Sequence, residues 1–325
     1  MRAAQVVRLD GPEGIEVRAD VPEPEAVAGF ARVRVEAAGL SFPDVLMSRG
    51  QYQFRPDLPF ATGVDLAGVL LDDASSQGLA AGTRVVAAIT HGAAAEIVAV
   101  PEDRLLPLPD VLAAEEAAGM PLTFLTAHFA LITRGEAREG DWVQVNGAAG
   151  GVGSAAVQVA KALGCRVVAL VSSPAEAAFV ERFGADAVLE VPDAAGVRAV
   201  TGGRGVDVVL DVVGTDEVVL EGLRSLAPQG RLLSIGYVGG SIPSVRLNRL
   251  LLNNIDVRGV SWGPYSRANP GFAQRQWSDI VRWCEAGLIV PSPATIRPID
   301  EAADALRDLD ERRVRGKVVL KLPTD

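Results

Sequence analysis

The sequence has little cysteine and little histidine. Its 325 residues include two cysteines, Cys165 and Cys284, and two histidines, His91 and His128. The cysteines are far apart and form no CxxC pair, which excludes a disulfide framework and a multi-cysteine metal site. A single histidine in each setting is more often a packed or exposed side chain than a metal ligand. We therefore expect a cytoplasmic chain without a bound metal.

Long apolar runs and excess positive charge are also missing. No uninterrupted apolar stretch reaches about 18 residues, the length of a membrane span, and Asp10 interrupts the amino-terminal segment before any such run. The formal net charge is −10, which repels nucleic-acid phosphates and anionic lipid. We expect no signal peptide and neither a nucleic acid nor a membrane as partner. A small molecule is the expected ligand.

The composition is that of a globular protein, and the length suggests about two domains. Up to about residue 118, short alternating runs such as 31–36 and 98–100 are separated by glycine and proline, a pattern that predicts antiparallel β-structure. The stretch 113–132 has helical composition apart from Pro121. The architecture is expected to change near residue 119.

A regular alternation of strands and helices follows. The expected strands are 142–146, 166–171, 187–191, 206–212 and 231–236, and the expected helices are 154–163, 174–183 and 216–226. These strands are apolar on both faces, which indicates a parallel sheet covered by helices. Two helices, 272–286 and 300–309, and a closing strand, 317–322, are expected in the tail, which we expect to return to the first domain.

A glycine-rich turn connects the first of these strands to its helix. The small residues Ala148, Gly150 and Gly153 form an A-x-G-x-x-G pattern, and Gly151 and Val152 complete it. Small residues allow the backbone to approach a pyrophosphate, and the following helix directs N–H groups and its dipole toward the anion. The alternative is a plain strand-to-helix turn in which the glycines only relieve crowding. The order of strand, turn, helix and strand favours a dinucleotide site.

The second strand ends without the acidic residue that usually binds the ribose of NAD. Ser172 and Ser173 stand there instead. Hydroxyl groups can donate to a ribose phosphate, so the sequence favours NADPH, with NADH possible. The two serines can equally cap the helix that begins at Pro174.

Several spaced motifs resemble one family, the zinc-independent medium-chain dehydrogenases/reductases, and within it the NADPH-dependent quinone oxidoreductases. The motifs are residues 39–45, 49–52, 58–68, 95–96, 148–153 and 202–211. The resemblance implies an α/β fold with a GroES-like, mostly-β catalytic domain (1–118 and 260–325) and a Rossmann domain with a doubly wound parallel sheet (119–259). Ser41 and Val64 stand where zinc-dependent relatives carry a cysteine and a histidine, so no metal is expected.

The resemblance also implies functional residues. Ser41 and Tyr52 match catalytic-site positions beside the nicotinamide, and Gly236 and Tyr237 match a segment of the cofactor site. Arg312 matches an arginine that can bind the ribose phosphate, although a surface turn explains it equally well. Relatives often carry a lysine and a tyrosine for that phosphate, and this chain has Glu176 and Val191 in their places. A carboxylate there opposes a phosphate.

The expected chemistry is hydride transfer from the nicotinamide to a quinone. Tyr52 is the candidate hydrogen-bond donor to the substrate, or else a tyrosine that packs a loop, while Asp44 and Asp65 are expected to be structural. Two alternatives stay open: a reductase of α,β-unsaturated carbonyl compounds or enoyl thioesters, and a dinucleotide-binding protein without catalysis. Relatives form dimers through the edge of the Rossmann sheet, so a homodimer is expected.

Overall fold

The computed structural model describes residues 1–190 and 193–323. It contains two compact units, which are treated separately below. The first comprises Met1–Leu122, Ala273–Trp277 and Pro291–Asp325, and the second comprises Thr123–Phe272 and Ser278–Val290. The domain boundaries inferred from the sequence, at 118/119 and 259/260, stay a prediction.

Two β-sheets form the first unit. The larger has the order β15-β16-β3-β5-β6-β8, with β7 also paired to β3, and the smaller has the order β2-β1-β4. The strands of the larger sheet are β3 (Phe30–Leu40), β5 (Asp65–Leu70), β6 (Arg84–Ala88), β7 (Ile97–Pro101), β8 (Leu105–Pro107), β15 (Ala294–Pro298) and β16 (Lys317–Lys321). Those of the smaller sheet are β1 (Ala3–Val6), β2 (Ile15–Arg18) and β4 (Phe60–Ala61).

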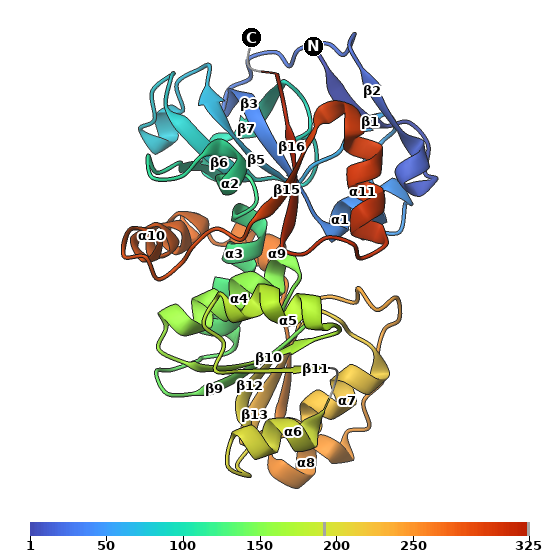
Figure 1. Ribbon diagram of the computed structural model, residues 1–325. Helices are drawn as coiled ribbons and strands as arrows, with labels where there is room; N and C mark the ends of the chain where they lie inside the picture. Colours follow the sequence, from blue (N-terminus) through green and yellow to red (C-terminus); the bar gives the residue numbers. More distant parts are fainter. Residues whose placement is uncertain (191–192, 324–325) are drawn as a thin grey trace. The chain divides into compact units, whose positions relative to one another are not determined.

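The carboxyl-terminal strand returns to this unit, as the sequence predicts. β16 pairs antiparallel with β3, and Val318 lies opposite Leu40. Both residues are fully buried in the core of the unit. In Figure 1 the dark red β16 accordingly lies among blue strands from the other end of the chain.

The first unit also contains helices, so the expectation of an all-β domain was incomplete. They are the α-helices α1 (Phe42–Ser48), α2 (Ala114–Ala117) and α11 (Ala302–Asp310), and the 3₁₀ turns η1 (Gly11–Gly14), η2 (Ser75–Gln77), η3 (Glu102–Arg104) and η5 (Ile299–Glu301). The helical stretch expected at 113–132 is broken, because α3 (Pro121–His128) begins anew at Pro121 and continues into a π-helix, η4 (Phe129–Arg134). The N–H groups in the first turn of a helix have no acceptor within it, so proline, which has no N–H group, is favoured at a helix start.

The second unit contains a six-stranded sheet in which every pairing is parallel. Its order is β11-β10-β9-β12-β13-β14, which is the 3-2-1-4-5-6 order of a doubly wound nucleotide-binding fold. The strands are β9 (Trp142–Asn146), β10 (Arg166–Val171), β11 (Ala187–Glu190), β12 (Val206–Asp211), β13 (Leu226–Ser234) and β14 (Asp256–Gly259). In such a sheet the ligand binds where the order reverses, here between β9 and β12.

Helices cover both faces of this sheet: α4 and α5 lie on one face, and α6, α7 and α8 lie on the other (Figure 1). The helices after η4 are α4 (Gly151–Ala162), α5 (Pro174–Glu181), α6 (Ala194–Val200), α7 (Asp216–Ser225), α8 (Asn248–Asn253), α9 (Trp262–Ala268) and α10 (Phe272–Glu285). The sequence placed the start of α4 at Ser154, three residues too late. Gly150 is its N-cap, with extended backbone angles.

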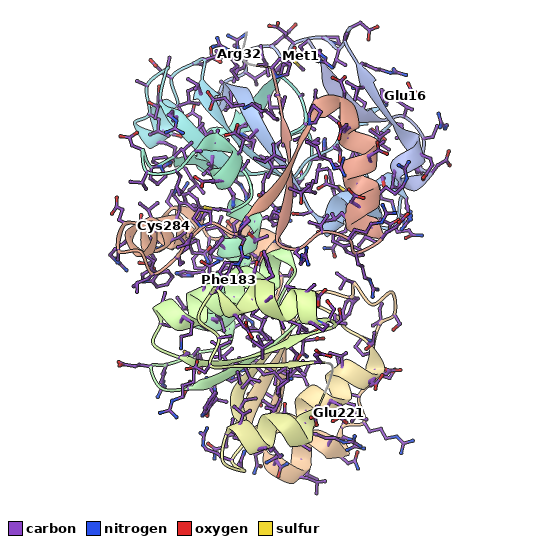
Figure 2. The ribbon with its side chains drawn as sticks, viewed as in Figure 1. Met1, Glu16, Arg32, Phe183, Glu221 and Cys284 are labelled. Carbon is purple, nitrogen blue, oxygen red and sulfur yellow. The ribbon has the colours of Figure 1, made fainter. Side chains whose placement is uncertain are left out.

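Both cysteines lie in the second unit and both are free. Figure 2 shows Cys284 on α10. Burial is the main cause that raises the pKa of each thiol to about 11, so both are thiols rather than nucleophilic thiolates at neutral pH. Among the described helices, none has the length and apolar character needed to span a bilayer.

Candidate functional site

The glycine-rich turn between β9 and α4 is fixed by backbone contacts. Ala148 donates from its N–H to the carbonyl oxygen of Leu170, at 3.1 Å, which ties the turn to β10. Gly147 has a φ of +68°, a conformation that favours glycine. At Gly153 an added Cβ would lie 2.1 Å from the carbonyl oxygen of Gly147. The third glycine of the motif is therefore required for the close packing of α4 on the turn.

Gly150 is different, because the fold itself does not require glycine there. Its φ is −77°, and an added Cβ would meet only the carbonyl oxygen of Gly147, at an ordinary 3.5 Å. The N–H groups of the first turn of α4, including those of Gly151 and Val152, have no acceptors within the helix. Open space beside these donors suits a pyrophosphate, so the turn could hold a dinucleotide.

The loop after β12 lies beside this turn and is organised by Asp211, which is fully buried. Its carboxylate accepts hydrogen bonds from the Asn146 side chain at 3.1 Å, the N–H of Val213 at 3.3 Å and the N–H of Gly214 at 3.0 Å. Burial raises the pKa of Asp211, and these hydrogen bonds oppose the rise. An added Cβ on Gly147 would touch the side chains of Val212 and Val213. The ends of β9 and β12 therefore meet at the switch point of the sheet.

Gly236 and Tyr237 lie on the adjacent loop after β13. The Tyr237 ring packs so closely on Gly214 that an added Cβ there would lie 2.5 Å from it. The ring is 43% exposed, and its hydroxyl lies 3.3 Å from the Ser234 hydroxyl. Gly236 has open space, since an added Cβ would meet only the carbonyl oxygen of Val212, at 3.5 Å. The structure thus brings these residues to the same edge of the sheet as the glycine-rich turn.

Glu176 forms hydrogen bonds with both serines at the end of β10. Its carboxylate accepts from the N–H of Ser172 at 2.7 Å and from the Ser172 hydroxyl at 2.8 Å. The Ser173 hydroxyl accepts from the N–H of Glu176 at 3.3 Å, so Ser173 is the N-cap of α5. The capping role considered for these serines is therefore present for Ser173, and a carboxylate stands at the ribose end of the expected site. Val191, the other position compared with relatives, lies outside the described residues.

In the first unit, Ser41 directly follows β3 and is the N-cap of α1. Asp44, three residues later, accepts from the N–H of Ser41 at 2.8 Å, the Thr62 hydroxyl at 3.0 Å and the N–H of Gly63 at 2.8 Å. Asp44 therefore joins the Ser41 loop to the segment before β5. Burial raises the pKa of Asp44 to about 6, against the effect of these hydrogen bonds. The contacts agree with the structural role expected for this carboxylate.

Lys317, at the start of β16, was not recognised from the sequence. Its side chain is buried, and its ammonium group donates to the Ser41 hydroxyl and lies 3.1 Å from the Asp65 carboxylate. The other Asp65 oxygen accepts from the N–H of Leu122 at 2.8 Å. The available signal was a lysine directly before three consecutive apolar residues, 318–320, of the closing strand.

Tyr52 is partly buried and packs against the core of the first unit. Within 1–190 and 193–323, its hydroxyl makes no hydrogen bond to another residue. Nearby in sequence, Phe54 stacks on the His91 ring at 5.7 Å between centroids, and Phe60 contacts the same ring edge-on at 5.6 Å. The Nδ1 atom of His91 is buried without a hydrogen-bond partner. These contacts place His91 in an aromatic cluster.

Arg312 follows α11 in a turn and has a φ of +57°. Its side chain is exposed, and the neighbouring Arg313 pairs with Asp308 at 2.9 Å. Among the described residues, no group of three or more histidine, cysteine, aspartate or glutamate side chains is placed to hold a metal. Val64 is 2% exposed and belongs to the apolar core.

Two family models match the chain. The alcohol dehydrogenase GroES-like domain matches residues 28–110, and the zinc-binding dehydrogenase model matches residues 151–285. A GroES-like domain joined to a Rossmann-type parallel sheet defines the medium-chain dehydrogenase/reductase superfamily. Within that superfamily, the chain belongs to the quinone oxidoreductase-like family.

Individual relatives are similar over their whole length. Quinone oxidoreductase-like protein 2 from Bos taurus is 34% identical, over 99% of this chain and 92% of its own. The quinone oxidoreductase of Thermus thermophilus, whose structure was solved alone and with NADPH, is 38% identical over 99% of this chain and 100% of its own, with a TM-score of 0.84. A mycobacterial protein solved with NADPH is 32% identical over the same shares of the two chains, with a TM-score of 0.91.

The buried Asp44 predicts a pH dependence of stability. Its pKa is about 6 in the folded protein against an ordinary 3.8, so the folded state binds more protons than the unfolded state between these values. The contribution of Asp44 to the free energy of unfolding is therefore largest at low pH. It falls by up to about 3 kcal/mol as the pH rises to about 6. We expect the Asp44→Asn variant to lose less stability than the wild type between pH 4 and pH 7 in urea unfolding.

The surface variant Asp57→Asn controls for the removal of one negative charge. An Asp44→Asn variant whose free energy of unfolding changes with pH as steeply as that of the wild type would contradict the assignment.

Proposed function

We propose that this chain is a metal-free, NADPH-dependent oxidoreductase that transfers a hydride to a quinone. The observation that carries the proposal is the open space beside Gly150. Neither backbone strain nor packing requires a glycine at this position, and a bound pyrophosphate would use the space. It lies at the amino terminus of α4, at the switch point of the sheet. The similarity to quinone oxidoreductases, including that of Thermus thermophilus with NADPH, supports both the cofactor and the substrate class.

The residues of the second unit are proposed to hold the cofactor. Within this segment, the backbone N–H groups of Gly151, Val152 and Gly153 would donate to the pyrophosphate, and the small residues Ala148 and Gly150 would let the backbone approach it. Gly236 and Tyr237 border the same edge of the sheet, and Ser172 and Ser173 stand at the end of β10. When bound, NADPH would supply the hydride that the chain itself lacks. Arg312 of the first unit is proposed to pair with the ribose phosphate.

Ser41 and Tyr52 are proposed to act on the substrate. Hydride transfer to a quinone places negative charge on its carbonyl oxygen, and oriented hydrogen-bond donors stabilise that charge. The Tyr52 hydroxyl has no protein partner among the described residues and is available to donate. Zinc is not part of the proposal, because Ser41 and Val64 replace thiolate and imidazole ligands and Val64 is packed in the core.

A homodimer is also proposed, through the edge of the parallel sheet. β14 is the last strand of the sheet, and such an edge presents unpaired N–H and C=O groups. Val257 on this strand is 41% exposed, and Leu251 and Leu252 of the preceding α8 are each 76% exposed. A second copy that pairs with β14 would cover these groups.

The proposed activity is tested by the oxidation of NADPH with 1,4-benzoquinone, 9,10-phenanthrenequinone, an enone and crotonyl-CoA. We expect turnover with both quinones, and the addition of a chelator should not slow it. The Gly150→Ala variant should bind NADPH roughly 5- to 150-fold more weakly, since overpacking by one methyl group costs about 1–3 kcal/mol. Fluorescence titration of NADPH measures this loss. Without cofactor, the free energy of unfolding of Gly150→Ala should stay within about 1 kcal/mol of the wild-type value.

Two glycine variants serve as controls. Gly153→Ala should be less stable even without cofactor, because its Cβ would meet the backbone of Gly147, whereas Gly263→Ala in α9 should bind NADPH as the wild type does. Reduction of the enone or of crotonyl-CoA but of neither quinone would favour the alternative activity. Loss of turnover on chelation would reject the metal-free proposal.

Glu176 predicts a limited preference for NADPH over NADH. Its carboxylate lies at the Ser172 hydroxyl, where it would repel a ribose phosphate. Glu176→Lys should therefore increase the ratio of NADPH to NADH affinity by roughly tenfold, which corresponds to about 1.4 kcal/mol, and Glu176→Gln should have a smaller effect. Glu181→Lys, on the exposed end of the same helix, is the control. Unchanged affinities in Glu176→Lys would show that this position does not contact the cofactor.

The dimer predicts a mass twice that of the 33.9 kDa chain in light scattering at micromolar concentration. A lysine in an edge strand opposes pairing, so Val257→Lys should shift the protein toward the monomer. Leu288→Lys, at an exposed position in the second unit, should remain dimeric. A monomeric wild type would reject the proposal.

A further inference from the structure

A buried lysine, Lys317, donates a hydrogen bond to Ser41, one of the proposed substrate-contacting residues. Lys317 is 4% exposed, while Lys321 at the other end of β16 is exposed. Lysine is almost never fully buried unless it is paired. The antiparallel pairing of β16 with β3 explains its position. Val318 lies opposite Leu40, the last residue of β3, so Lys317, which precedes Val318, lies beside Ser41, which follows Leu40.

The fold provides space and a counter-charge for this side chain. The aliphatic stem of Lys317 lies beside Gly119, where an added Cβ would be 3.4 Å from the lysine Cβ and 3.5 Å from its Cγ. Its ammonium group lies 3.1 Å from the carboxylate of Asp65, which has no exposed surface. Burial raises the pKa of Asp65, and the positive charge of Lys317 opposes this rise. The Lys317–Asp65 pair is thus a buried ion pair.

The chemistry of an ammonium group then fixes the orientation of the Ser41 hydroxyl. A lysine ammonium group has three donors and no acceptor, so the Ser41 oxygen must accept in the hydrogen bond from Lys317. The hydroxyl hydrogen consequently points away from Lys317 and is available to an acceptor. The Ser41 backbone is fixed as well, since its N–H donates to Asp44 at 2.8 Å. A charged donor behind the oxygen also makes the hydroxyl a stronger donor.

We propose that Lys317 is a positioning residue that holds the Ser41 hydroxyl as a hydrogen-bond donor toward the substrate carbonyl oxygen. This role rests on the proposed function, in which negative charge develops on that oxygen as hydride arrives at carbon. Lys317 does not touch the substrate. It acts through Ser41, and the Asp65 carboxylate holds the ammonium group in place.

A double-mutant cycle tests this role through steady-state oxidation of NADPH by 1,4-benzoquinone. We expect Lys317→Met to lower kcat roughly tenfold or more, with little change in the KM for NADPH. Ser41→Ala should lower kcat to a similar extent, and Lys317→Met should have no further effect in the Ser41→Ala background. Equal effects of Lys317→Met in the two backgrounds would overturn the proposal, because a purely structural role does not require Ser41.

Two further variants separate positioning from folding. Lys317→Met leaves Asp65 buried without its partner, so the double variant Lys317→Met/Asp65→Asn removes both charges together. We expect it to unfold at nearly the wild-type temperature while it retains the loss of kcat, and recovery of wild-type kcat in it would also overturn the proposal. Lys321→Met, on the same strand but paired at the surface with Glu115 at 2.9 Å, should turn over as the wild type does.

The wild-type assay distinguishes the two proposals. A wild-type enzyme that reduces none of the quinones, the enone or crotonyl-CoA would reject the proposed function and this role with it. Turnover by the wild type without coupling between Lys317 and Ser41 would reject the role of Lys317 alone.

Discussion

The antiparallel pairing of β16 with β3 is the constraint on which the candidate site of the first unit depends. It joins two segments that are 276 residues apart at Ser41 and Lys317. Successive side chains of a strand point to opposite faces, so a shift of one residue would turn Lys317 away from Ser41 and Asp65. Val318 and Leu320 oppose such a shift, because they belong to the apolar core of the unit and would move to the face that Val319 now occupies. The register that buries the apolar residues therefore also places the ammonium group.

A comparable constraint acts in the second unit at the glycine-rich turn. Gly153 allows α4 to approach the carbonyl oxygen of Gly147, and this approach fixes where the helix begins. Because the first turn of α4 is fixed, its N–H groups have a defined position beside the open space at Gly150. Asp211 fixes the neighbouring loop through neutral donors. The N–H groups at this edge are thus positioned by backbone packing rather than by charged side chains.

The sequence predicted the parts of this structure that depend on local pattern. Apolar strands such as β9 and β10 were located to the residue, since each is buried on both faces and bounded by polar or glycine residues. Pro121 was noted as the exception to the helical composition of 113–132, but the early start of α4 at Gly151 was missed, because glycine at a helix start is also typical of a loop. Ser41 was singled out through its motif. Lys317 was not, because its contacts with Ser41 and Asp65 arise only from long-range strand pairing.

The charge on Lys317 is not needed merely to satisfy a buried carboxylate in this fold. Asp44 and Asp211 are buried as deeply as Asp65, and the hydrogen bonds that hold them come from hydroxyl, amide and backbone N–H groups. Burying an ammonium group carries its own desolvation penalty, and replacing a buried ion pair by neutral groups is often neutral or stabilising. Stability therefore gives little reason for a lysine at this position. Its distinct property is a fixed positive charge that donates to the Ser41 oxygen, which directs the serine hydrogen toward an external acceptor.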